Sequence, residues 1–170
     1  MSASPVGPSQ TAINVAVLTP LFQIRGSMQV LGNLQTYLND DQRPTFSVQT
    51  ASVLGLAMSN PAAQMSQAEM FVLKQEAHVI AIEGVPPAGA IMLQPRFESL
   101  VLYTPLFAIM GKFHMGPDVR LADFTATSIV QFLPVSECRF FPLYQSRPGM
   151  VGGASVALVQ RSAVVTYHRS

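Results

Sequence analysis

Cysteine, charged residues and long apolar runs are all scarce in this chain of 170 residues. The single cysteine, Cys138, rules out an intramolecular disulfide and therefore a secreted disulfide scaffold. No apolar run approaches the roughly 18 residues of a membrane helix, and residues 1–11 lack the basic start and apolar centre of a signal peptide. We therefore expect a cytoplasmic protein without a membrane span. In its strand-like segment, Cys138 fits a buried, inert thiol better than a reactive one.

Charged residues make up 11% of the chain, against about a quarter in an average protein. Hydrophobic residues reach 49%, which excludes a disordered polypeptide. Two interpretations of the scarce charge remain open. Part of the surface is covered by other subunits, or a surface rich in Ser, Thr and Gln keeps a single chain soluble.

The residues that usually carry chemistry do not form a recognisable set. His78, His114 and His168 lie in different predicted strands, without Cys or carboxylates at ligand spacing, so no metal is predicted. Ser27, His114 and Asp118 could be drawn as a catalytic triad, but no nucleophile motif supports it. The glycines form neither a phosphate-binding loop nor a dinucleotide fingerprint. We predict no catalytic residues, no cofactor and no small-molecule substrate.

What the chain does contain is an internal repeat. Residues 18–26 read LTPLFQIRG and residues 103–111 read YTPLFAIMG, at a constant offset of 85. A fixed offset of this size indicates a duplicated structural unit. The shared residues that we predict to be structural are Thr19, Pro20, Phe22 and Gly26 in the first copy and Thr104, Pro105, Phe107 and Gly111 in the second.

The repeat divides the chain into four parts. Residues 1–12, which are rich in Ser, Pro and Gly, are predicted to be a flexible arm. Residues 13–83 form the first repeat, 84–95 a Pro/Gly linker, and 96–170 the second repeat. The predicted fold class is mainly β. Each repeat would contain about five strands and one short helical turn, curled into a small barrel that hides its sheet edges.

Within each repeat the pattern starts with a hairpin. Apolar residues alternate with polar ones on both sides of the Thr-Pro pair, and proline ends the first strand because it cannot donate to a ladder. Gly26, in the middle of the second strand, indicates a bulge or bend. Leu34, Tyr37 and Leu38 then follow a helical spacing that Asn33 can cap. Residues 121–124 match this turn in the second repeat.

Two local patterns resemble the Sm-like small β-barrel. One is the hairpin whose second strand, 22–30, carries a central glycine. The other is the closing element 71–82, which is similar in layout to the hydrophobic–Arg-Gly–hydrophobic element of that family. Lys74-Gln75 and Gln160-Arg161 stand where the family has Arg-Gly, and its Asp…Met-Asn pattern is missing. The repeat also resembles small bacterial domains with a Thr-x-x-Phe-x-Ile-x-Gly start. The Sm-like resemblance implies a small barrel and binding of uridine-rich, single-stranded RNA.

The two halves differ in charge. Residues 13–84 contain three basic and five acidic side chains, a net charge of −2, and residues 96–170 contain seven basic and four acidic, a net charge of +3. Opposite signs on homologous halves would suit head-to-tail pairing between molecules. Random substitution of charged residues on solvent-exposed faces would produce the same net charges.

These observations favour a non-catalytic structural or adaptor protein that forms a homo-oligomer or docks on a protein partner through apolar β surfaces. The alternative is an Sm-like binder of single-stranded nucleic acid that uses the basic second half. A third hypothesis, an enzyme or a small-ligand pocket at the interface between the halves, has no residue to support it. Functional surfaces are expected where the copies differ, at Arg25 against Met110 and in the loops after Leu56 and Leu143. The candidate contact residues for nucleic acid or a partner are Arg120, Arg139, Arg147, Arg161 and Tyr144.

Overall fold

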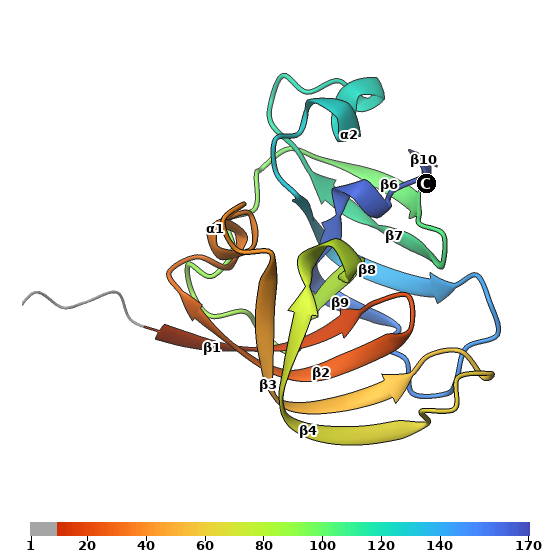
Figure 1. Cartoon of the computed structure of the whole chain (residues 1–170). Coiled ribbons are helices and arrows are strands. Elements are labelled where there is room, and N and C mark those ends of the chain that lie inside the picture. The colour runs from red at the N-terminus through yellow and green to blue at the C-terminus, as the bar shows by residue number, and fades with distance from the viewer. Residues whose placement is uncertain (1–9) are drawn as a thin grey trace, which may run out of the picture.

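A computed structural model describes residues 10–170, in which ten strands form one open antiparallel sheet (Figure 1). The strand order is β10-β6-β7-β8-β9-β5-β1-β2-β3-β4. The first nine residues of the predicted arm lie outside the described residues, and its last three, 10–12, belong to the first strand. The strands are β1 (Gln10–Leu18), β2 (Phe22–Leu31), β3 (Thr45–Gly55), β4 (Gln64–Leu73), β5 (Val79–Ile82), β6 (Phe97–Tyr103), β7 (Phe107–His114), β8 (Phe132–Pro142), β9 (Gly153–Gln160) and β10 (Thr166–Arg169).

The order shows two copies of the same five-stranded arrangement. The first repeat runs β5-β1-β2-β3-β4 across the sheet, the second runs β10-β6-β7-β8-β9, and β9 pairs with β5. In Figure 1 the first repeat, from red to yellow-green, occupies the lower part of the molecule, with the second above it. The predicted mainly β class is confirmed. Closure of each repeat into a barrel stays a prediction, because the strand pairing defines one open sheet.

Short helices occupy equivalent places in the two repeats. Helix α1 (Leu34–Leu38) lies between β2 and β3, and η2 (Leu121–Asp123) with α2 (Phe124–Thr127) lies between β7 and β8. The one-turn helices η1 (Lys74–Glu76) and η3 (Arg161–Ala163) precede the last strand of each repeat. The predicted helical turn and its cap are confirmed, because the Asn33 side chain accepts hydrogen bonds from the Gln35 and Thr36 amides.

The repeated Thr-Pro motif forms the first hairpin turn of each repeat. The Thr19 hydroxyl oxygen accepts a hydrogen bond from the Phe22 amide at 2.9 Å, and Thr104 accepts one from Phe107 at the same distance. Both threonines are buried, so these bonds satisfy groups that water cannot reach. The motif therefore has the structural role that we expected from its sequence.

The glycine of each motif lies at a bulge. The pairing of β2 with β3 shifts register between Arg25 and Ser27, and that of β7 with β8 shifts between Met110 and Lys112. A Cβ atom on Gly26 would lie 2.4 Å from the Gln49 carbonyl oxygen, and one on Gly111 would lie 2.6 Å from a Val135 methyl carbon. The predicted bend at Gly26 is thus confirmed, and its cause is close approach of the neighbouring strand.

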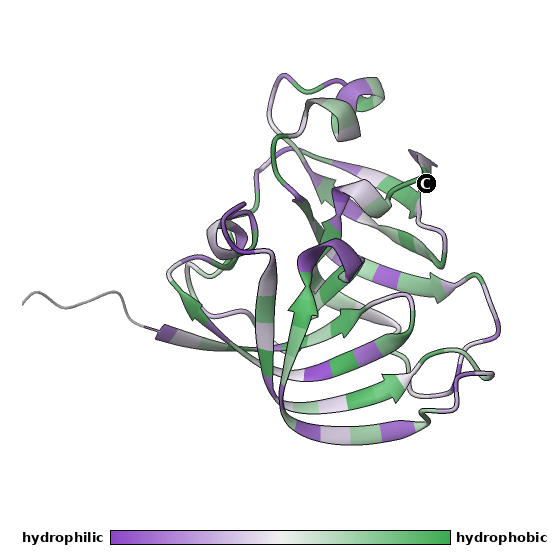
Figure 2. Cartoon of the chain, viewed as in Figure 1, coloured by the Kyte–Doolittle hydropathy of each residue, from purple (hydrophilic) through white to green (hydrophobic). Residues whose placement is uncertain are grey.

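The interior consists of two hydrophobic clusters that interlock across the repeats. The first cluster is built mainly from the first repeat but includes Phe132, Val156 and Leu158 of the second. The other contains the core of the second repeat together with Leu18, Val79 and Ala81 among its first-repeat members. Hydrophobic and hydrophilic residues alternate along β2 in Figure 2, as a strand with one buried face requires.

Replacing Gly26 or Gly111 with Ala should lower the free energy of unfolding by about 1–3 kcal/mol, because the added methyl group overlaps the neighbouring strand. Urea denaturation followed by circular dichroism measures the change. Gly152→Ala is the matched control, since a Cβ atom there meets nothing within 4 Å. Equal stability for all three variants would contradict the role of the two bulges.

Cys138 should resist thiol reagents in the folded protein. It is buried, its Sγ atom donates to the Ala154 carbonyl oxygen, and burial raises the pKa of the thiol to about 11. The reactive thiolate is therefore scarce near pH 8. Labelling with a chromogenic disulfide should be slow without denaturant and fast in urea. Fast labelling of the native protein would show that the site is accessible.

Candidate functional site: the repeat junction and the open sheet edges

The ladder between β5 and β9 joins the repeats into one sheet. Val79 pairs with Val159, Ile80 with Leu158 and Ala81 with Ala157. The ladder continues where the Gln160 amide donates to the His78 carbonyl oxygen at 2.9 Å. Every side chain in the three pairs is fully buried. One edge strand of each repeat, β5 and β9, is therefore paired within the junction and is no longer an open edge.

Polar side chains hold the junction on both sides of this ladder. The Asn39 side-chain oxygen accepts hydrogen bonds from the Gln131 and Phe132 amides, at 2.7 and 3.1 Å. The buried Gln23 side chain donates to the Gly149 carbonyl oxygen and accepts from the Val151 amide. These bonds join backbone of one repeat to side chains of the other, so they fix the relative position of the two halves.

The loops after Leu56 and Leu143, expected to be functional because the copies differ there, also belong to the junction. The Arg147 amide donates to the Leu56 carbonyl oxygen at 2.6 Å, and the Met58 amide donates to Gln145. The Arg147 side chain donates to the carbonyl oxygens of Gly55 and Asn60, at 3.1 and 2.7 Å. These two loops, which differ between the copies, therefore contact each other at the junction.

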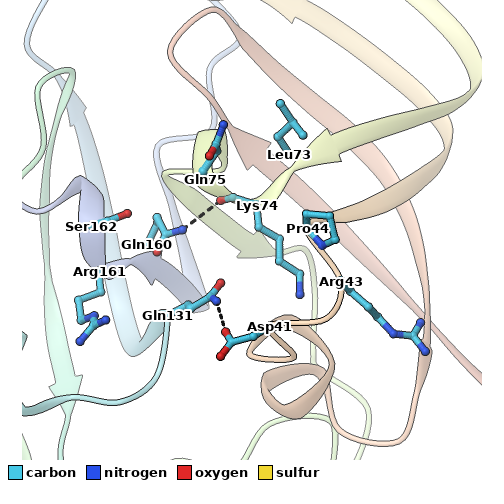
Figure 3. Close-up of a pocket in the computed structure, with 10 residues that line it drawn as sticks. All are labelled: Asp41, Arg43, Pro44, Leu73, Lys74, Gln75, Gln131, Gln160, Arg161 and Ser162. Atoms are coloured by element: carbon cyan, nitrogen blue, oxygen red, sulfur yellow. Dashed lines mark hydrogen bonds between the residues drawn. The ribbon is translucent and has the colours of Figure 1, made fainter.

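A polar cleft of about 370 Å³ opens at one end of the junction (Figure 3). Two hydrogen bonds cross it, from Gln160 Nε2 to the Lys74 carbonyl oxygen and from Gln131 Nε2 to Asp41 Oδ1. The cleft is rich in amides and cations, which makes it a candidate binding site for a small polar group. It is lined by Asp41, Arg43, Pro44, Leu73, Lys74, Gln75, Gln131, Gln160, Arg161 and Ser162.

Lys74, in the wall of this cleft, is a buried lysine with a structural task. Its Nζ atom donates to the backbone carbonyl oxygens of Asp40 at 2.8 Å and Tyr37 at 3.4 Å, which follow or end helix α1. Burial lowers the pKa of Lys74, and the carboxylates of Asp40 and Asp41 act in the opposite direction. The ammonium group thus ties η1 to the end of α1.

At the opposite edges of the sheet, β4 pairs only with β3 and β10 only with β6, so within the described residues each has one side without a neighbouring strand. Equivalent residues of the two repeats are 87 positions apart here, since η1 starts at Lys74 and η3 at Arg161. Phe71 on β4 thus corresponds to Leu158 on β9. Phe71 is 71% exposed and Leu158 is 0% exposed, because β5 covers Leu158. The outer edge of the first repeat therefore presents an apolar side chain where the second repeat buries one.

An apolar groove of about 280 Å³ lies beside β4. The first copy of the repeated motif lines one side of it with Pro20, Leu21 and Phe22, and β4 lines the other. Leu21 is 61% exposed there, whereas its counterpart Leu106 packs against the core of the second repeat. The groove makes the β4 edge a candidate docking surface.

The five predicted contact residues come from separate elements of the second repeat. Arg120 precedes η2 and pairs with Asp123 at 2.8 Å, and Arg139 is exposed on β8. Arg147 holds the loop described above, and the Arg161 guanidinium donates to the Ser128 carbonyl oxygen in the wall of the cleft. Tyr144 packs edge-on against Phe107, and burial raises the pKa of its hydroxyl.

Only Arg161 of these five lines the cleft. Arg25 and its counterpart Met110 were also expected to be functional. Arg25 forms an ion pair with Glu83 at 3.1 Å, and Met110 is half exposed. Sequence reasoning missed Gln131, Gln160 and Phe71. A signal was available for Gln160, because its counterpart in the first repeat, Leu73, is apolar.

The described residues contain no group of three or more His, Cys, Asp and Glu side chains that could hold a metal ion. The His114 ring contacts Ser136 Oγ at 2.7 Å and the Gln94 carbonyl oxygen at 2.6 Å. These neighbours are neither Ser27 nor Asp118, with which a triad could be drawn in the sequence. Within residues 10–170, no helix is long and apolar enough to cross a membrane.

Comparison with protein-family models, curated proteins and solved structures found no match to the chain. The resemblance to Sm-like barrels therefore stays a prediction.

Replacing Lys74 with Met should lower the free energy of unfolding by about 1–3 kcal/mol, because two partly buried carbonyl groups lose their donor. Thermal or urea denaturation measures the loss. Lys112→Met, which removes a partly exposed ion pair with Glu137, is the control and should cost about 1 kcal/mol or less. If Lys74→Met were no more destabilising than the control, the tie between η1 and α1 would not matter.

Proposed function

We propose that this chain is a non-catalytic, cytoplasmic structural or adaptor protein. It is built from two small barrel-like repeats and associates with itself, or with a protein partner, through the open edges of its sheet. The observation that carries the proposal is the contrast between Phe71, which is exposed, and its buried counterpart Leu158. The chain already uses edge pairing to join its own repeats, and the outer edges offer the same backbone groups.

Apolar exposure at the β4 edge supports association further. Phe71, Leu73 and Leu21 are all exposed beside the apolar groove. Leu73 is 47% exposed, whereas its counterpart Gln160 is 4% exposed and bonded across the junction. A long strand edge with exposed apolar side chains is the kind of surface that another strand covers. Such a surface needs no catalytic group to function.

The alternative, a binder of single-stranded nucleic acid, has less support. The basic residues of the second repeat come from separate elements, and the guanidinium groups of Arg120, Arg147 and Arg161 have partners within the chain. Its best candidate surface is the cleft that contains Arg161 and Gln131. Salt-dependent retention of single-stranded RNA, lost on replacing Arg161 with Ala, would favour this alternative.

Association is tested by measuring the mass of the wild-type chain with light scattering over a range of concentrations. We expect a mass above that of one chain, and we expect Phe71→Asp to shift it towards the monomer, because a carboxylate at this edge opposes burial. Circular dichroism verifies that the variant is folded.

Val85→Asp is the matched control. Val85 is 92% exposed and follows β5, an inner strand of the sheet, so this variant should assemble as the wild type does. A wild-type chain that stays monomeric at its highest soluble concentration would refute self-association. Assembly that survives Phe71→Asp unchanged would show that the β4 edge is not the contact surface.

A further inference from the structure

We infer that the occupant of the β4 edge is a second copy of this chain, whose β10 strand adds to β4 as β5 adds to β9 within one chain. This inference rests on the proposed function and adds to it the partner, its direction and its register. The β10 strand is the counterpart of β5, and β4 is the counterpart of β9. The two outer edge strands of one molecule therefore correspond to the two strands that pair at its internal junction.

The internal junction fixes the register between copies. Val79 corresponds to Thr166 and Val159 to Val72, both at the offset of 87, so the observed pair Val79–Val159 becomes Thr166 opposite Val72 of the second copy. The following pairs are Tyr167 opposite Phe71 and His168 opposite Met70. One step further places Arg169 opposite Glu69.

The backbone groups of both edges point the right way for this register. The Lys74 amide donates to Pro44, on the β3 side, so the alternation of an antiparallel ladder turns the N–H and C=O groups of Phe71 and Glu69 outward. On β10 the Ser170 amide donates to Ser99, on the β6 side, which turns the groups of Tyr167 and Arg169 outward. In the inferred register, residues whose backbone N–H and C=O groups face outward on β4 lie opposite residues whose groups face outward on β10. This is the arrangement that hydrogen-bonded pairs of an antiparallel ladder require.

The side chains of these pairs complement each other. The Phe71 ring would be placed beside Tyr167, which packs edge-on against Phe124 at a centroid distance of 6.0 Å. Within the chain, Leu158 makes the equivalent insertion into the first cluster beside Ile80. An aromatic pair across two strands stabilises a sheet beyond the area it buries.

Charge also favours the head-to-tail direction. Glu69 and Arg169 are exposed and carry opposite charges at directly opposed positions of the inferred ladder. The first repeat has a net charge of −2 and the second of +3, so contact between unlike repeats is favoured over contact between like repeats. Because the two surfaces differ, the contact leaves a free edge at each end, and assembly continues until a ring closes or a filament forms.

Paired charge reversals test the register. Glu69→Arg and Arg169→Glu should each reduce the mass measured by light scattering towards that of one chain, because each places like charges opposite each other. An equimolar mixture of the two variants should recover the wild-type mass, since each β4 then meets a β10 of opposite charge. A mixture that stays dissociated, or single variants that assemble normally, would overturn the inferred register while leaving association itself intact.

A second pair of variants tests the backbone ladder. Phe71→Pro removes an outward N–H without affecting the bonds to β3, and Phe71→Thr removes the ring but keeps the N–H. We expect the proline variant to assemble less than the threonine variant at equal concentration. Equal assembly would argue against strand addition.

Cross-linking gives an outcome that does not depend on charge. Chains carrying Glu69→Cys should form disulfides with chains carrying Arg169→Cys when the two are mixed and oxidised, because directly opposed residues of a ladder lie within disulfide reach. Cross-linking within each variant alone, with none between the two, would indicate two-fold pairing of like edges and overturn the inference. A monomeric wild type would refute the proposed self-association and this inference together.

Discussion

The ladder between β5 and β9 is the constraint on which the rest of the molecule depends. It turns two five-stranded units into one sheet, and it buries Val79, Ile80 and Leu158 in clusters that neither repeat completes alone. Asn39, Gln23 and Arg147 then connect polar groups of the two halves around it. Because a buried ladder tolerates no unpaired backbone groups, the relative position of the repeats is fixed at this junction.

Duplication explains which features recur and which do not. The threonine turn, the glycine at the bulge and the short helix after the second strand occur in both copies, because each unit needs them to fold. Leu73 and Gln160 are counterparts that differ, and they meet different surroundings. Gln160, buried at the junction, replaces Leu73, which lies at the open edge. The difference between these two counterparts therefore matches their positions in the sheet.

The sequence predicts the local structure well and the long-range structure poorly. The hairpins, the bulge at Gly26 and the turn capped by Asn33 follow from alternation, glycine and capping chemistry, all of which act over a few residues. The cleft could not be predicted, because Asp41 and Gln131 meet across 90 residues of sequence without any local pattern. One signal was overlooked. The run from Val79 to Ile82 is apolar on both faces, which is typical of an inner strand, whereas Thr166–Arg169 is polar.

The position of β5 in the sheet has a consequence for synthesis on the ribosome. Its partner β9 is translated more than 70 residues later. The apolar edge of β5 therefore stays unpaired while the second repeat is being translated. Nascent chains with unpaired strand edges are prone to misassociate with one another. The two repeats can therefore complete the sheet only together, and until β9 has been made β5 lacks one of its two neighbouring strands.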